Sequence, residues 1–182
     1  MRLFVAVDVP DGLKEGIEAR IVAPLRGVLP GARWTRPEGR HLTLKFLGNV
    51  EDEREPLIAE TVRVVAARHT SFDAAFAEVG GFPNLGRPRV LWVGLGRGND
   101  QMAQVARDLE ETLEPLGFEP EDRPFRGHFT LARFPKPSRV DALPALSVPD
   151  GAFRVEGITL FRSHLHPKGA RYEALRHAPL RG

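Results

Sequence analysis

The chain has 182 residues, which suffice for one domain with a hydrophobic core or for two small lobes that share one. Its composition, 42% hydrophobic and 27% charged residues, is that of an ordinary soluble globular protein, and its net charge is only +2. Cysteine is absent, which excludes disulfide bonds and thiolate-bound zinc or iron–sulfur centres. No apolar run approaches the roughly 20 residues of a membrane-spanning helix, and the start of the chain reads as a strand rather than a signal peptide. We therefore expect a cytoplasmic protein with no membrane partner.

Hydrophobic spacing predicts alternating strands and helices in the first part of the chain. Asp11 is placed to cap the first helix, and Pro24 should kink or shorten it. Acidic residues at the start of the second helix suit the positive end of its dipole. The elements expected here are a strand over 2–9, a helix over 11–28, strands over 33–35 and 41–48, and a helix over 51–69.

The second part of the chain follows the same mixed pattern. Asp100 is placed to cap a third helix, and four prolines predict a surface loop or linker over 135–151. The apolar parity changes at Gly157, which indicates a β-bulge there. The elements expected are a strand over 72–79, a loop over 80–88, a strand over 90–93, a helix over 100–113, a strand over 128–133, and a hairpin of 153–161 with 171–176.

Two strands carry the same polar motif, His-x-Thr. In the first copy His41, Thr43 and Lys45 alternate with apolar residues, so they are expected on one face of the strand. The second copy places His128 and Thr130 two residues apart, again on one face. One such motif would mean little, but two copies in opposite halves of the chain predict two matched walls of one cleft.

Basic residues gather around both motifs. The window from 33 to 45 carries a charge of +3 and the window from 123 to 139 carries +5, so the rest of the chain is net negative. Either window alone would be read as an ordinary solvated surface. Their coincidence with both His-x-Thr motifs favours a polyanionic ligand, such as a phosphoester or an RNA end.

Two imidazoles across a cleft can transfer protons at a phosphate ester without a metal. Histidine titrates near neutrality, so one ring can take a proton from the attacking water while the other gives a proton to the leaving oxygen. Thr43 and Thr130 can donate hydrogen bonds to the non-bridging phosphate oxygens, and nearby basic side chains can offset developing charge. A strained 2′,3′-cyclic phosphate at an RNA end fits this hypothesis well.

The two motifs with their flanks resemble those of a known superfamily. His41-Leu42-Thr43-Leu44-Lys45-Phe46-Leu47-Gly48 and His128-Phe129-Thr130-Leu131-Ala132-Arg133 are similar to the signatures of the two-histidine phosphoesterases, and within them of the RNA 2′,3′-cyclic phosphodiesterases, also called 2′-5′ RNA ligases. The resemblance extends to Trp34 and to segments 2–7, 81–94 and 160–163.

This resemblance implies an enzyme that needs no metal and no cofactor. It implies that His41 protonates the departing 3′ oxygen and that His128 activates water, leaving a 2′-phosphomonoester, although a symmetric cleft would also allow the roles to be exchanged. An RNA 5′-hydroxyl in place of water would give a 2′-5′ linkage. The motif suggests phosphate binding by Arg133, but strict alternation places this residue on the face opposite His128 unless a twist or bulge re-aims it. Arg126 has the matching parity and is the second candidate, and Lys45 is a further one.

We predict a mixed α/β (α+β) fold of a single compact domain over 1–182. It would consist of two pseudo-symmetric lobes, each with one motif strand, and of two mainly antiparallel sheets that face a central groove, with helices outside. The expected partner is an RNA or nucleotide end bearing a 2′,3′-cyclic phosphate, bound by a monomer. The alternative is a non-catalytic RNA-end or nucleotide-binding protein that uses the same basic groove. Phe46, Phe82 and Trp34 could stack on a base, but we expect each in the core.

Overall fold

The architecture is taken from a computed structural model of the chain, which describes residues 1–136, 146, 148–166 and 170–182. The loop predicted over 135–151 lies mostly outside these residues. The described chain contains both helices and a largely antiparallel set of strands, which confirms the mixed α/β class. The strands are β1 (Arg2–Asp8), β2 (Arg33–Trp34), β3 (His41–Asn49), β4 (Phe72–Ala74), β5 (Phe76–Phe82), β6 (Val90–Leu95), β7 (His128–Arg133), β8 (Phe153–Val155), β9 (Gly157–His164) and β10 (Arg171–Pro179).

The first two helices are shorter than the apolar spacing predicts, whereas the third agrees with its predicted range. The first one is interrupted by a π-helical stretch, so that Pro24 lies in the first turn of a new α-helix, where its missing N–H costs nothing. Pro10 and Gly98, rather than Asp11 and Asp100, occupy the N-cap positions, and both aspartates lie in the first turn. The α-helices are α1 (Asp11–Ile17), α2 (Ala23–Arg26), α3 (Glu55–Ala66) and α4 (Asn99–Leu113).

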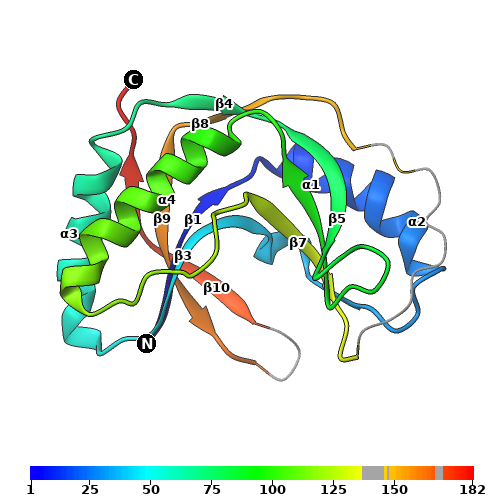
Figure 1. Cartoon of the computed structure of the whole chain (residues 1–182), viewed down its shortest axis with the longest axis horizontal. Coiled ribbons are helices and arrows are strands. Elements are labelled where there is room, and N and C mark those ends of the chain that lie inside the picture. Colours follow the sequence, from blue (N-terminus) through cyan, green and yellow to red (C-terminus); the bar gives the residue numbers. More distant parts are fainter. Residues whose placement is uncertain (137–145, 147, 167–169) are drawn as a thin grey trace.

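One curved antiparallel sheet dominates the fold (Figure 1). Its strand order is β10-β9-β1-β3-β7-β6-β5, and β2 pairs with β7 beside β3. The two expected sheets are thus joined, and the junction is narrow, because β3 and β7 share the single register pair Leu42–Phe129. Strands β4 and β8 form a separate two-stranded ladder.

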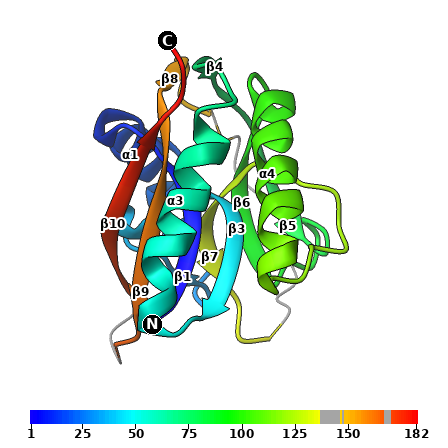
Figure 2. The same ribbon diagram turned by 90° about the vertical axis from the view of Figure 1, so that its left-hand side faces the viewer.

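The hydrophobic core lies between this sheet and the helices. Helices α3 and α4 run side by side over one face of the sheet (Figure 2). Each turns a buried apolar stripe inward, exemplified by Ile58 and Val62 on α3 and by Val105 and Leu109 on α4. The opposite face of the sheet is the one that carries both histidine motifs. Among the described residues there is no helix of the length and apolarity that a membrane crossing requires.

Two of the predicted strands are wrong in their pairing or extent. The strand over 72–79 breaks at Ala75, whose N–H donates to the carbonyl of Arg97 outside the ladder, and the second piece continues to Phe82 through part of the predicted loop. The segment 153–155 does not join the C-terminal hairpin but pairs with β4. Local alternation cannot reveal such long-range choices of partner.

Candidate active site

Both His-x-Thr motifs lie on adjacent strands. The pairing of Leu42 with Phe129, continued by one residue to each side, sets His41 opposite Thr130 and Thr43 opposite His128. Residues directly opposite on paired strands share a face, and diagonal neighbours lie about 7–8 Å apart. The two imidazoles and two hydroxyls therefore form one cluster on what we call the histidine face of the sheet. Within the described chain, neither threonine hydroxyl is used in a hydrogen bond, so both are available to a ligand.

A β-bulge follows the second motif and changes the side on which the next residues point. Thr130 pairs with Trp92 and Ala132 with Leu91, which leaves Leu131 unpaired. The bulge turns Arg133, opposite Val90, back onto the histidine face, because Val90 and Trp92 share that face of β6. The bulge therefore provides the change of direction that Arg133 needs to share a face with His128.

The first motif contains a bulge at the equivalent place. Thr43 pairs with Ala6 and Lys45 with Val5, which leaves Leu44 unpaired. The next residue, Phe46, pairs with Phe4 and so lies on the histidine face, where its side chain is 54% exposed. The prediction that Phe46 belongs to the core is wrong for this reason.

The ring of His41 is enclosed by aromatic side chains from three neighbouring strands. Phe4 and Phe161 stack on it at centroid distances of 4.7 and 5.3 Å, and Tyr172 meets it edge-on at 4.9 Å. Burial in this setting lowers the pKa of His41 to about 4, while the carboxylate of Asp8 acts in the opposite direction. The unliganded protein consequently holds this imidazole neutral at pH 7.

The ring of His128 is oriented by the backbone. Its Nδ1 lies 2.8 Å from the carbonyl oxygen of Arg126. A carbonyl can only accept, so Nδ1 carries the proton and the neutral ring presents Nε2 as an acceptor. Phe82 packs edge-on against the ring at 5.1 Å. Burial lowers the pKa of His128, the hydrogen bond to the carbonyl of Arg126 acts in the opposite direction, and the charge of Arg133 lowers the pKa further.

A buried hydrogen-bond network holds the bulge of the second motif. The hydroxyl of Thr35 lies 2.8 and 2.9 Å from the carbonyl oxygens of Thr130 and Leu131. Behind it, Arg40 donates to the hydroxyl and carbonyl oxygens of Thr35 and forms an ion pair with Glu18. The side chain of Arg40 is fully buried, and this residue directly precedes His41. The network thus connects the start of one motif strand to the bulge of the other.

Comparison with known proteins identifies the family of this chain. The family model described as the 2′-5′ RNA ligase superfamily matches residues 14–167. The chain belongs to that superfamily. It is 37% identical over 179 residues to an RNA 2′,3′-cyclic phosphodiesterase of Archaeoglobus fulgidus, covering 97% of this chain and 98% of the relative. A protein of the same name from Thermus thermophilus is 37% identical over 190 residues, covering 100% and 91%.

Solved structures of similar proteins have the same fold. A crystal structure of a Thermus thermophilus protein superposes with a TM-score of 0.86 at 33% identity, covering 100% of this chain and 99% of that one. A crystal structure of E. coli LigT complexed with 3′-AMP gives a TM-score of 0.78 at 27% identity, covering 98% and 97%. The fold of this 2′-5′ RNA ligase superfamily member therefore extends over the whole chain.

Lys45 does not reach the histidine face in this superfamily member. The bulge at Leu44 reverses its direction, and the side chain is 2% exposed beneath α4. Its ammonium group forms an ion pair with Glu110 and donates to the carbonyl oxygen of Glu119. The prediction that Lys45 shares a face with His41 is wrong, and its charge is neutralised within the fold.

Arg126 lies at the edge of the candidate site. Its guanidinium stacks over Trp92 at 4.6 Å and forms an ion pair with Glu78 at 2.6 Å. The indole of Trp92 occupies the space above Gly80, where a Cβ atom would lie 2.2 Å from it. Of this wall beside His128 the sequence indicates Arg126 but not Trp92, and it does not indicate the aromatic enclosure of His41, because these rings come from strands without a His-x-Thr motif.

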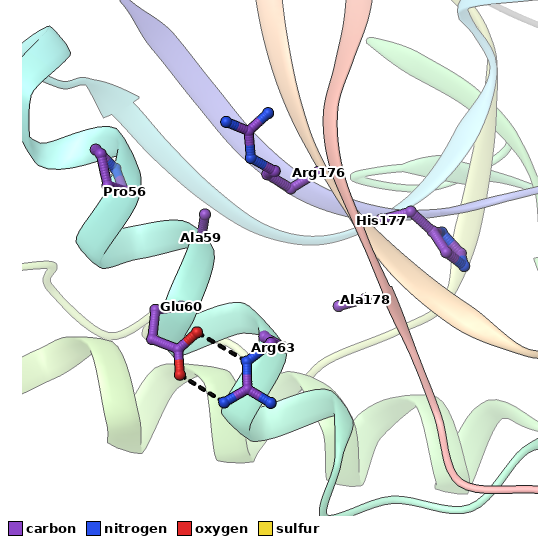
Figure 3. Close-up of a pocket in the computed structure, with 7 residues that line it drawn as sticks. All are labelled: Pro56, Ala59, Glu60, Arg63, Arg176, His177 and Ala178. Atoms are coloured by element: carbon purple, nitrogen blue, oxygen red, sulfur yellow. Dashed lines mark hydrogen bonds and ion pairs between the residues drawn. The ribbon is translucent and has the colours of Figure 1, made fainter.

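One shallow pocket lies elsewhere, between α3 and β10 (Figure 3). Its lining includes Arg63, Arg176 and His177 but no residue of either motif. Glu60 and Arg63 form an ion pair across its rim, as the dashed lines in Figure 3 mark. The third charged side chain of the lining, Arg176, lies 3.8 Å from Glu55 of α3, and we assign this pocket no ligand.

Proposed function

We propose that the protein is a phosphodiesterase that opens the 2′,3′-cyclic phosphate at the end of an RNA and leaves a 2′-phosphomonoester. The observation that carries the proposal is the cluster of two imidazoles and two hydroxyls on one face of adjacent strands, where the hydroxyls form no hydrogen bond to any described residue. Relatives named RNA 2′,3′-cyclic phosphodiesterase, similar over nearly the whole chain, support the same activity. The structure of a similar protein with 3′-AMP supports a nucleotide as the ligand.

In the proposed reaction a water molecule attacks phosphorus and the bond from phosphorus to the 3′ oxygen breaks. His128 accepts the proton of the water at Nε2, the ring nitrogen that its backbone hydrogen bond leaves unprotonated. His41 donates a proton to the departing 3′ oxygen. Thr43, Thr130 and Arg133 hold the non-bridging oxygens and offset the charge that develops on them.

The local charges favour this division of roles. Asp8 favours the protonated form of His41, whereas the charge of Arg133 favours the neutral form of His128. Burial keeps His41 neutral in the unliganded protein, but the negative charge of a bound phosphate raises the pKa of an adjacent imidazole. Substrate binding therefore supplies the charge that the acid needs.

Replacing water by the 5′-hydroxyl of a second RNA would use the same two groups and produce a 2′-5′ linkage, so we propose ligation as a side activity. The monomeric state, the two-lobe organisation and the cytoplasmic location stay predictions.

The test is to incubate the protein with an oligoribonucleotide that ends in a 2′,3′-cyclic phosphate, in the presence of EDTA. We expect turnover to a 2′-phosphate, and a loss of about 10²–10⁴-fold in kcat for His41→Ala and for His128→Ala. His164→Ala is the matched control, because that imidazole pairs with Glu173 at the exposed end of β9. Tight binding of the RNA end without turnover would instead support the non-catalytic alternative.

A further inference from the structure

A second arginine stands beside Arg133 on the histidine face. Arg33 of β2 and Arg133 of β7 are directly opposite each other in register. Such pairs share a face, with Cβ atoms about 4.5–5.5 Å apart. Since the bulge at Leu131 turns Arg133 onto the histidine face, Arg33 is on that face as well. Its neighbour Trp34 points the other way, where Arg26 stacks over the indole at 5.7 Å.

The charges of this arginine pair are not neutralised by the described part of the fold. Neither Arg33 nor Arg133 forms an ion pair with a described carboxylate, and both side chains are exposed. Arg40, Arg126 and Arg154, by contrast, each have an acidic partner. Like charges directly opposite on a strand pair are destabilising, so a bound anion would relieve an existing repulsion.

The position of the pair relative to the histidines defines which anion fits. Along β7 the order on the histidine face is His128, Thr130 and then Arg133, with Arg33 alongside the last. The cyclic phosphate of the proposed function lies at the histidines, within reach of Arg133. Arg33, on the strand next to Arg133, therefore lies farther from the histidines on the same face, where a second phosphate of the same ligand would lie.

We propose that Arg33 binds the phosphodiester that precedes the cyclic phosphate, so that the substrate is an RNA chain of at least two nucleotides rather than a single cyclic nucleotide. This inference rests on the proposed function and adds a subsite to it. A guanidinium binds phosphate oxygens in a bidentate, charge-assisted manner, which favours Arg33 for this contact. The neutralisation of one further phosphate also makes binding more sensitive to salt.

The experiment compares kcat/KM for three substrates that end in the same cyclic phosphate. They are a nucleoside 2′,3′-cyclic monophosphate, a dinucleotide with a normal diester linkage, and the same dinucleotide with an uncharged methylphosphonate linkage. We expect the wild type to prefer the charged dinucleotide over the uncharged one by about tenfold, the value of one charge-assisted contact. For Arg33→Gln this ratio should fall to about 1, and Arg33→Lys should restore part of it.

Arg107→Gln is the matched control, because it removes one exposed positive charge from α4, on the other side of the sheet. This variant should keep the wild-type ratio. For the charged dinucleotide, the slope of log kcat/KM against log salt concentration should be shallower by about 0.7 in Arg33→Gln than in the wild type.

A wild type that turns over both dinucleotides equally well, or an Arg33→Gln variant that keeps the full preference, would overturn the subsite while leaving the proposed function intact. Failure of the wild type on all three substrates would contradict the proposed function itself.

Discussion

The burial of His41 has a consequence for stability that can be measured without any substrate. Its imidazole titrates near 6.5 in the unfolded chain, but burial lowers the pKa to about 4 in the folded protein. Between these values the unfolded chain binds a proton that the folded protein rejects, so the free energy of unfolding rises with pH. The stabilisation is present above pH 6.5 and is lost as the pH falls towards 4. At about 1.4 kcal/mol for each pH unit, the loss from this one group amounts to up to about 3 kcal/mol.

The perturbation is His41→Gln, which keeps a polar side chain of similar size but cannot titrate. Urea unfolding of the wild type and the variant would be followed between about pH 8 and pH 4. Other groups affect both proteins alike, so the informative quantity is the wild-type free energy of unfolding minus that of the variant. We expect this difference to be constant above pH 7 and to fall by up to about 3 kcal/mol on going to pH 4. A difference that does not change with pH would refute the inference that the aromatic enclosure excludes the charged imidazole.

Three further substitutions test other parts of the structure. Arg40→Met leaves the buried network behind the bulge without its donor, and should lower the free energy of unfolding by about 3 kcal/mol in urea titrations; an unchanged midpoint would argue against the network. Gly80→Ala forces a methyl group against Trp92 and should cost about 1–3 kcal/mol by thermal unfolding, whereas Gly12→Ala, with open space around it, should not destabilise. Lys45→Met should lower stability by about 2 kcal/mol yet leave kcat/KM for a cyclic phosphate near the wild-type value; a large loss of activity would restore Lys45 to the site.

The fold class and the positions of the motif strands could be predicted because each depends on local alternation. His41, Thr43, His128 and Thr130 follow a period of two within strands that are regular at that point, so their common face was readable from the sequence. The direction of Lys45 and Phe46 could not be predicted, because the unpaired Leu44 reverses the side chains that directly follow it. Nothing in a run of leucines and threonines distinguishes a bulged residue from a paired one.

Contacts between strands distant in sequence could not be predicted either. The enclosure of His41 requires that β1, β9 and β10 become neighbours in a particular register, and Phe161 carries no sign of this in its own segment. The pairing of β8 with β4 is another example, because the short alternating segment that precedes Gly157 would fit either partner. Alternation predicts that a segment is a strand with one buried face, but the partner is chosen by packing across the whole sheet.

The two bulges shape the backbones of the two motif strands alike, but they place different residues at the matched position of the site. Each leaves unpaired the leucine three residues after the motif histidine, and each returns the residue five positions after that histidine to the histidine face. At this equivalent position one motif carries Phe46 and the other Arg133. The two matched bulges thus present an apolar ring on one side and a cation on the other, so in the proposed function we expect the phosphate on the His128 side and a less polar part of the ligand at the ring. A symmetric backbone with unlike residues at matched positions can in this way orient a nucleotide in one direction, and a single orientation is what separate acid and base roles for the two histidines require.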